Sequence, residues 1–446
     1  MRGWLARSGR LGPAARSGRL GSSQTSQTSQ LSQVGSPRWP RRPKIVIVPD
    51  MVPAAERWLA AGAAAEPPDG GDMTDRPLAL VDHHVHGAVA SPLDGPGIEL
   101  LLTEALAPAP PGTTMWDTQL GFAVRRQCAP VLGLEPSAPP GEYVARRAEL
   151  GPAEVNRRFL EAAHVEAWLV DTGYQSDQVM TPAQLEAASG APAHEIARLE
   201  SIAERVARAG GDAAGFAADF EAALQVAAAG AVGLKSIAAY RYGLDFDPAP
   251  PSAAEVRAAA GHWLVALQAD PGARLEDPVL LRHVIWAGAR TGLPLQFHVG
   301  LGDPEARLHR ADPGLMHDFL LATQDLGTPI MLLHCYPYHR QAGCLASVFP
   351  HVYLDVGEAL NHVGARSAAV LAEALEVAPF HKLLYSSDAF GLAELHYLGA
   401  FGFRRDLDRV IGAFVADDAW TRADGDRVAR LVGAENSRRV YGLEGR

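Results

Sequence analysis

The sequence has little cysteine and contains no CxxC motif. Its three cysteines are Cys128, Cys335 and Cys344. A small number of cysteines that cannot all be paired argues against a disulfide scaffold and indicates a reducing compartment. We therefore expect a cytoplasmic protein.

Long apolar runs are also absent. The longest candidate, residues 222–234, is interrupted by Gln225 and falls short of the roughly 18 residues that span a membrane. We therefore do not expect this chain to be an integral membrane protein. The 446 residues are nonetheless 48% hydrophobic and 20% charged, which excludes a fully disordered chain and leaves enough apolar material for a large core.

Negative charge is missing from the beginning of the chain. Residues 1–44 hold nine Lys and Arg residues and no Asp or Glu, whereas the whole chain has a net charge of −11, which leaves −20 for the rest. A body this acidic is not expected to bind nucleic acid through its surface field. The expected partner is a small-molecule substrate.

The acid-free leader is also of low complexity. Residues 21–30 consist only of Gly, Ser, Gln and Thr, and such a composition cannot bury a core. We expect residues 1–75 to form a disordered, basic extension. Two alternatives stay open: a transit peptide rich in Arg and Ser, or a mis-assigned start, because Met73 begins a stretch that resembles a natural N-terminus leading into a strand.

From residue 76 onwards, short runs rich in Val, Ile and Leu alternate with Ala-rich helical stretches. This alternation is typical of βα units and of a parallel sheet buried on both faces. The predicted fold class is therefore α/β, a (β/α)8 TIM-type barrel over residues 76–446. The eight predicted strands, of which the third also fits a helix, are 78–84, 165–171, 197–201, 232–237, 295–299, 330–335, 352–356 and 383–388.

About 80 residues separate the first two predicted strands, which is too many for a simple βα loop. Helical segments within this stretch are separated by Pro-rich sequence. We expect residues 87–164 to form a helical insertion over the active-site face of the barrel, where substrate enters.

The strongest local motif is a pair of histidines, His84 and His86, at the end of the first predicted strand. Side chains two residues apart on a strand point to the same face. Both imidazoles then enter the C-terminal mouth of the barrel, where barrel enzymes place their sites. Two buried core histidines are the alternative.

Chemically active side chains also end four other predicted strands: Lys235, His298, His334 and Asp388. Imidazole and carboxylate groups that converge on one mouth suit Zn²⁺, Mn²⁺ or Fe²⁺. Structural alternatives exist for these residues. Asp388 also suits the N-cap of a following helix, and Lys235 also suits an ion pair with Glu200 or Asp171, or a contact to a substrate anion.

Several residues just after the strand ends are candidates for lining the pocket. Tyr240, Arg241, Tyr336 and Arg340 are the substrate-binding candidates, with either arginine suited to a substrate carboxylate or to a surface ion pair. Glu358, Asn361 and His362 follow the seventh strand and form a second group of candidates.

Longer stretches carry a family resemblance: 233–241 (GLKSIAAYR), 334–340 (HCYPYHR), 352–357 (VYLDVG) and 385–391 (YSSDAFG). Together with the order HxH, Lys, His, His, Asp they resemble the amidohydrolase superfamily, in its amidohydrolase-2 branch. They are most similar to the barrels that fungal and plant proteins of the FluG and nodulin type fuse to a glutamine-synthetase-like domain. The resemblance covers residues 76–446. Ala393 departs from it where proline is expected.

The resemblance implies that His84, His86, His298 and Asp388 bind a divalent metal, most commonly Zn²⁺. His334 is implied as a ligand of a second metal or as the group that polarises the substrate carbonyl. Lys235 is implied as a carbamylated bridge if two metals are bound. Catalytic roles thus fall to Asp388, His334 and Lys235.

The expected reaction is hydrolysis of an amide-like C–N bond in a small, carboxylate-bearing substrate by a metal-activated water. Asp388 is suited to take the proton of this water and pass it to the leaving group. Two alternatives stay open: a decarboxylase or isomerase on the same site, and a non-catalytic partner of a glutamine-synthetase-like protein. Each of these three functions is compatible with a homo-oligomer.

The beginning of the chain gives a first prediction. If translation starts at Met73, mass analysis of the N-terminus of the native protein finds no peptide from residues 1–72. Peptides from that stretch would show that the leader is made.

Overall fold

The computed structural model describes residues 77–175 and 177–444. The predicted extension, residues 1–75, lies outside them. No helix in this described part is long and apolar enough to cross a membrane.

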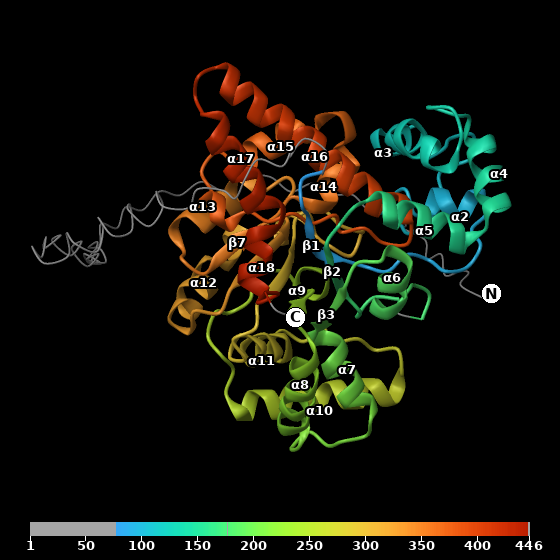
Figure 1. The fold of residues 1–446 in the computed structure, drawn as a ribbon. Helices are drawn as coiled ribbons and strands as arrows, with labels where there is room; N and C mark the ends of the chain where they lie inside the picture. The colour runs from blue at the N-terminus through green and yellow to red at the C-terminus, as the bar shows by residue number, and fades with distance from the viewer. Residues whose placement is uncertain (1–76, 176, 445–446) are drawn as a thin grey trace, which may run out of the picture. The chain divides into compact units, whose positions relative to one another are not determined.

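Seven parallel strands form one curled sheet in the order of the sequence. Each strand pairs with the next one along the chain, as βα units require. The sheet lies at the centre of the described fold, with the helices around it (Figure 1). The strands are β1 (Val81–Val85), β2 (Ala167–Asp171), β3 (Ala193–Arg198), β4 (Gly233–Ser236), β5 (Leu295–Val299), β6 (Ile330–His334) and β7 (Val352–Leu354).

The predicted eighth strand, 383–388, is not a regular strand. It forms an isolated parallel bridge with β7 at Leu383 and donates from Leu384 N to Leu354 O at 3.0 Å. On its other side, His83 N on β1 donates to Tyr385 O at 3.2 Å. Asp388 has a left-handed backbone, with φ of 49°, which ends the extended conformation. The arrangement is consistent with a TIM-type fold.

The third predicted strand, 197–201, was placed too late in the sequence. β3 covers Ala193–Arg198, and residues from Leu199 on form helix α7 (Leu199–Arg208). The error has a physical cause, because Ile196, Ala197 and Leu199 are all buried. A continuous buried run does not show where a strand ends and a helix begins.

Helices fill every connection. Between β1 and β2 lie α2 (Gly95–Leu100), α3 (Gln119–Ala123), the π-helical turn η3 (Val124–Cys128), the 3-10 turn η4 (Ala129–Leu132), α4 (Pro140–Leu150) and α5 (Pro152–Ala162). The next connections hold α6 (Pro182–Ser189), α7, α8 (Phe216–Gly230), α9 (Ala238–Arg241), α10 (Ala253–Ala269) and α11 (Pro278–Ala289).

The second half of the fold continues the same alternation. It holds the 3-10 turns η5 (Leu308–Arg310) and η6 (Pro313–Met316), α12 (His317–Thr323), η7 (Gln324–Leu326), α13 (His339–Val348), α14 (Gly357–Val363), η8 (Gly364–Arg366), α15 (Ser367–Ala374) and η9 (Phe380–Lys382). The chain then forms α16 (Ala393–Ala416), α17 (Arg422–Arg430), the π-helical turn η10 (Leu431–Glu435) and α18 (Asn436–Tyr441).

Local sequence explains where the helices start. Ser252 caps α10 in a capping box, in which Glu255 N donates to Ser252 Oγ and Ser252 N donates to the Glu255 carboxylate. Asp277 caps α11 ahead of a proline, Pro278, whose missing N–H costs nothing at a helix start. These caps satisfy N–H groups that a helix cannot pair internally.

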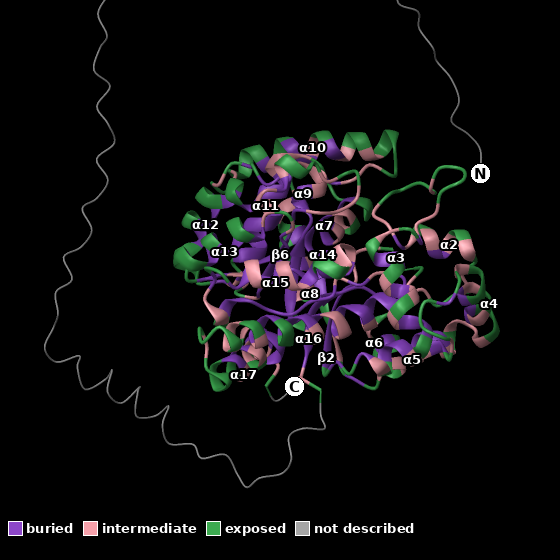
Figure 2. Cartoon of the chain, turned by 90° about the horizontal axis from the view of Figure 1, so that it is seen from above, coloured by how far each residue is buried: buried purple, intermediate pink, exposed green. Residues whose placement is uncertain are grey.

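Strand side chains divide between two cores. On β5, Leu295, Phe297 and Val299 pack outward against the helices, in the larger hydrophobic cluster. Gln296 and His298 alternate with them and face the inside of the sheet. The smaller cluster, which includes Leu333 of β6 and the C-terminal Tyr441, fills that inside. The strands are buried while α10, α12 and α13 expose their outer faces (Figure 2).

A buried ion pair fastens the helices after β1 to α16. Arg147 Nε on α4 donates to Glu394 Oε1 at 2.6 Å, and the Tyr143 hydroxyl donates to the same oxygen at 3.0 Å. The Glu394 side chain is 1% exposed. A buried carboxylate that loses its cation is strongly destabilising, because its charge stays desolvated without a partner.

The second prediction tests this pair. Arg147→Met is expected to lower the free energy of unfolding by about 3–5 kcal/mol, measured by urea denaturation. The control is Arg205→Met on α7, an exposed arginine, with an expected change within about 0.5 kcal/mol. Equal losses in both variants would show that the pair contributes nothing.

Candidate metal centre

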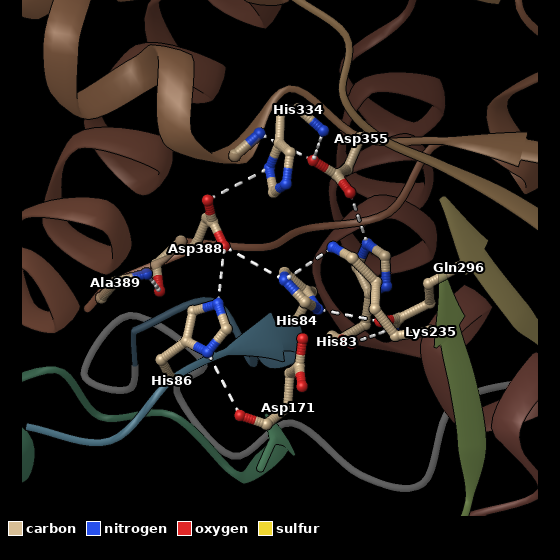
Figure 3. A network of polar contacts seen from close by, with 12 residues as sticks. His83, His84, His86, Asp171, Lys235, Gln296, His334, Asp355, Asp388 and Ala389 are labelled. Carbon is tan, nitrogen blue, oxygen red and sulfur yellow. Dashed lines mark hydrogen bonds and ion pairs between the residues drawn. The ribbon is translucent and has the colours of Figure 1, made fainter. Parts of the chain in front are cut away.

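Three histidines surround the carboxylate of Asp388 at the carboxyl ends of the strands (Figure 3). His84 Nε2 lies 3.1 Å and His86 Nε2 3.7 Å from Asp388 Oδ1. His334 Nδ1 lies 3.4 Å from Asp388 Oδ2. Residues that are up to 304 positions apart in the sequence therefore meet at one point.

The tautomer of His84 follows from its neighbour Gln296. Gln296 Nε2 donates to the backbone carbonyl of His83 at 2.8 Å, and this oxygen can only accept. The amide oxygen of Gln296 therefore faces His84 Nδ1, at 2.8 Å, and accepts its proton. In the neutral imidazole, Nε2 then carries the lone pair, which faces Asp388 Oδ1 at 3.1 Å and the Lys235 ammonium at 3.3 Å.

His86 is held in the same way. Its Nδ1 donates to the backbone carbonyl of Asp171 at 3.1 Å, so its Nε2 also presents a lone pair to Asp388. Burial lowers the pKa of His86 to about 4. Burial, together with the charge of Lys235, holds the pKa of His84 well below its ordinary value. Both imidazoles are therefore neutral at pH 7.

Two lone pairs that face a carboxylate oxygen repel one another unless a proton or a cation lies between them. Asp388 Oδ1 is buried and has no hydrogen-bond partner, and burial raises the pKa of Asp388 to about 7. His84, His86 and Asp388 offer ligand atoms within 4.8 Å of one another. Two nitrogens and one carboxylate oxygen are a usual ligand set for Zn²⁺ and similar ions. These residues therefore fit a divalent cation.

Lys235 ends β4 beside this group. Its Nζ donates to His84 Nε2 at 3.3 Å, and burial lowers its pKa to about 8. The structure shows no direct ion pair of Lys235 with Glu200 or Asp171, although the charge of Asp171 acts on it. Glu200 accepts from Ser236 and Ile237, and Asp171 is paired with Arg198 at 2.6 Å.

A second buried network fixes His334 from behind. Asp355 Oδ1 accepts from His334 N at 2.9 Å, and Asp355 Oδ2 accepts from His83 Nε2 at 3.0 Å. His83 Nδ1 in turn accepts from the Tyr441 hydroxyl at 3.0 Å. His334 has a φ of 65°, a strained conformation for a residue with a side chain. The Asp355 network supplies the contacts that hold it there.

His298 lies beside this group. Its ring contacts Tyr240 and His334, with ring centroids 4.2 and 4.8 Å apart. His298 Nε2 is buried without a hydrogen-bond partner. Among the residues that the structure describes, His298 belongs to none of the groups whose ligand atoms lie within 4.8 Å of one another. Its predicted role as a metal ligand stays a prediction.

The four substrate-binding candidates divide into two pairs. Tyr240 and Arg241 line a cavity of about 910 Å³, which His84, His86 and Asp388 also line. Tyr336 and Arg340 are not among its lining residues. Arg340 is 57% exposed and is paired with Glu376 at 2.9 Å, and Tyr336 stacks on His339. The structure does not support substrate contacts for this second pair.

Similarity to known proteins agrees with this geometry. Residues 81–443 match the family model described as Amidohydrolase. The chain belongs to the amidohydrolase family. The predicted resemblance to this family is thereby confirmed.

Individual relatives of this amidohydrolase include protein fluG of Emericella nidulans, 33% identical over 225 residues. That match covers 48% of this chain and 26% of fluG, so the chain spans well under two thirds of its relative. A crystal structure from Lactobacillus casei, provisionally described as a metal-dependent hydrolase, is 29% identical with a TM-score of 0.69, over 82% of this chain and 96% of that one.

The glucuronate isomerase of Caulobacter crescentus shares the fold. It is 15% identical with a TM-score of 0.58, over 83% of this chain and 92% of that one. The fold is therefore found in proteins named for isomerisation as well as for hydrolysis, and does not by itself decide the reaction.

Several residues of this amidohydrolase site were not predicted. Gln296 lies two residues before His298 on β5, so the period of the strand gives a signal for it. Asp355, His83 and Tyr441 act from behind the ligands, and no pattern in the sequence connects them. Glu104, which lines the cavity, lies in a stretch without a recognisable motif.

The third prediction concerns Gln296. Gln296→Leu leaves the His84 Nδ1–H and the His83 carbonyl without partners, and we expect Zn²⁺ affinity to fall roughly 10- to 100-fold. Competition with a chromogenic chelator measures it. The control is Gln225→Leu on the exposed face of α8. Unchanged affinity in a folded Gln296→Leu protein would refute the proposed orientation of His84.

Proposed function

We propose that this amidohydrolase cleaves an amide-like C–N bond in a small, carboxylate-bearing molecule. The observation that carries the proposal is the pairing of two features in one cavity. At its floor, the lone pairs of His84 and His86 face Asp388. On its wall lies Arg241, a cation that its protein neighbours do not saturate.

A divalent cation held by His84, His86 and Asp388 would lower the pKa of a water molecule toward ~7 and so supply a nucleophile at neutral pH. Asp388 is placed to accept the proton from that water at one carboxylate oxygen. The same group then delivers the proton to the nitrogen of the leaving amine. Without a metal, burial raises the pKa of Asp388 to about 7; a cation bound beside it would lower this pKa and keep the carboxylate ionised, as a proton acceptor must be.

His334 and Lys235 would act on the substrate carbonyl. His334 Nδ1 lies 3.4 Å from Asp388 Oδ2, on the side of the carboxylate away from His84. A donor there stabilises the charge that develops on the carbonyl oxygen during attack. The buried ammonium of Lys235, 3.3 Å from His84 Nε2, adds positive charge at the same floor. A carbamylated Lys235 would instead bridge two metals.

Arg241 is the proposed anchor for the substrate carboxylate. Its Nε is buried without a partner, and its ion pairs to Glu204 and Glu305 are long, at 3.8 and 3.7 Å. Both carboxylates already have nearer donors, since Glu305 accepts from Arg274 at 2.8 Å and Glu204 from Leu275 N at 3.1 Å. A substrate carboxylate can therefore form the bidentate contact that the guanidinium lacks.

Within this class we propose γ-glutamyl amides as the first substrates to test. The resemblance to barrels fused to a glutamine-synthetase-like domain supports this choice, and a γ-glutamyl group carries the required carboxylate. The same proposal includes Zn²⁺ as the metal, a cytoplasmic location, a homo-oligomer as a possible state, and a functional link to a glutamine-synthetase-like protein.

A second candidate is an isomerase or decarboxylase that uses the same residues. The shared fold with the glucuronate isomerase of Caulobacter crescentus favours it. Such a reaction needs Asp388 to move a proton between carbon or oxygen atoms of one substrate, and it releases no amine. The product therefore separates the two candidates.

The fourth prediction tests the reaction. The Zn²⁺-loaded enzyme is expected to release amine from γ-glutamyl amides, and Asp388→Asn to slow kcat roughly 100- to 10,000-fold. Arg241→Met is expected to raise KM about 10- to 100-fold, because one charge-assisted contact is lost. Arg257→Met on the exposed face of α10 is the control.

Other products would change the assignment. Release of carbon dioxide, or an aldose–ketose change without release of amine, would favour the second candidate. A protein that is inactive toward all three classes, yet binds a glutamine-synthetase-like protein tightly, would instead indicate a non-catalytic partner.

A further inference from the structure

A second group of possible ligands lies in the same cavity, apart from the three histidines. It consists of Glu104, which follows α2, and of Glu358 and His362, both on α14. Glu358 and His362 are four residues apart, so they share one face of the helix. The ligand atoms of these three side chains lie within 4.8 Å of one another. We call them the α14 cluster.

Glu358 is the unusual member of the α14 cluster. It is only 5% exposed, and its Oε2 is buried without a hydrogen-bond partner. Among residues 77–175 and 177–444, no Lys or Arg forms an ion pair with it. A buried carboxylate oxygen without a partner is unfavourable, because it has lost its hydration and gained no hydrogen bond in exchange. In the described part of the chain, Glu358 therefore lacks a cation in direct contact, and Lys235 acts on it only from a distance.

Two acidic neighbours of Glu358, Glu104 and Asp388, increase the need for a cation at this point. Burial raises the pKa of Glu358 well above its ordinary range, and the charges of Glu104 and Asp388 raise it further, whereas the charge of Lys235 lowers it. His362 Nε2 lies 3.3 Å from Glu104 Oε1, so the cluster already gathers an imidazole and a second carboxylate. A cation at this point would interact favourably with all three groups.

The start of α14 holds Glu358 in place. Gly357 N donates to Asp355 Oδ1 at 2.8 Å, so the same carboxylate that fixes His334 also fixes the beginning of this helix. A Cβ atom at position 357 would collide with Ser386 Oγ. Only glycine therefore allows α14 to begin so close to residues 383–388, the predicted eighth strand. Glu358 is thus presented by a rigid element.

From this arrangement we infer that Glu104, Glu358 and His362 form a second divalent-cation site in the cavity. Two carboxylates and one imidazole suit Zn²⁺ or Mn²⁺. The ligand atoms of a tetrahedral ion lie roughly 3.4 Å apart at bond lengths near 2.1 Å, so the side chains of the cluster would have to move closer together to bind it. The site does not depend on Lys235.

Glu358 also connects the two sites. Its carboxylate belongs to a second group of nearby ligand atoms, with His334 and Asp388, again within 4.8 Å of one another. The carboxylate of Glu358 therefore lies between the α14 cluster and the group at Asp388. A second ion would sit on the α14 side of the cavity and would add positive charge beside the acyl group of the substrate.

The fifth prediction is a metal count on the full chain, purified without chelator and dialysed against Zn²⁺ alone. Elemental mass spectrometry is expected to find two Zn²⁺ per chain in the unaltered protein, and one in Glu104→Gln and in His362→Asn. His86→Asn is expected to lose the other ion. His262→Asn, an exposed histidine on α10, is the control and keeps both.

Two results would overturn the inference. One is a single Zn²⁺ per chain that His362→Asn leaves unchanged, and the other is a second Zn²⁺ that Lys235→Ala removes while Glu104→Gln does not. Co²⁺ absorption spectra of the same variants distinguish loss of a ligand from loss of folding. The inference stands apart from the proposed reaction, because these counts need no substrate, and inactivity of a protein with two ions would count against the reaction alone.

Discussion

The structure depends on one electrostatic constraint at the end of the sheet, where two imidazole lone pairs converge on one carboxylate and the Lys235 ammonium is the nearest cation. His84 and His86 turn lone pairs toward a carboxylate that also lacks a donor. Such an arrangement is unfavourable in isolation, and it persists because other groups fix each ligand. Gln296 orients His84, a backbone carbonyl orients His86, and Asp355 fixes the backbone of His334. A convergence of lone pairs and a carboxylate oxygen of this kind suits a divalent cation.

The same network links the site to the stability of the fold. Tyr441, at the end of α18, fills the inside of the sheet and reaches both His83 and Gln296 through its hydroxyl. The far end of the chain thus supports the first and fifth strands from within. Strained residues such as His334 and Asp388, with φ of 65° and 49°, are tolerated where such contacts over-determine the backbone. Catalytic groups and the centre of the fold are therefore built from one polar core.

Charge is distributed unevenly around the cavity. Arg241 lies on the wall formed by the segment after β4, with a guanidinium that its neighbours only partly satisfy. Glu104 and Glu358 lie where the segments after β1 and β7 meet. On each wall one buried polar atom has no hydrogen-bond partner, Nε of Arg241 on the first and Oε2 of Glu358 on the second. The first wall suits a carboxylate and the second suits a cation.

Much of this could be predicted from the sequence, for identifiable physical reasons. Parallel strands that are buried on both faces appear in the sequence as continuous apolar runs, and such runs predict the strands. The predicted strand 295–299, for example, coincides with β5. A polar residue at the end of an apolar run is conspicuous, and for this reason Lys235, His334 and Asp388 were found as candidates. Where burial continued through a strand into a helix, as at Leu199, the boundary was misplaced. Where backbone strain replaced regular pairing, as at Asp388, the strand was overestimated.

The sequence alone determined the alternation of strands and helices and the residue types that meet at their ends, because both depend on local periodicity. Only the tertiary structure decided the directions of the lone pairs and the partners of the charges. Arg340 and Arg241 are equally plausible substrate contacts by sequence. The first is paired with Glu376 on the surface, whereas the second is buried in the cavity with its Nε unpartnered. Glu104 and Glu358, 254 residues apart, become neighbours only when the sheet curls, since contacts across the mouth depend on distances that no local pattern encodes.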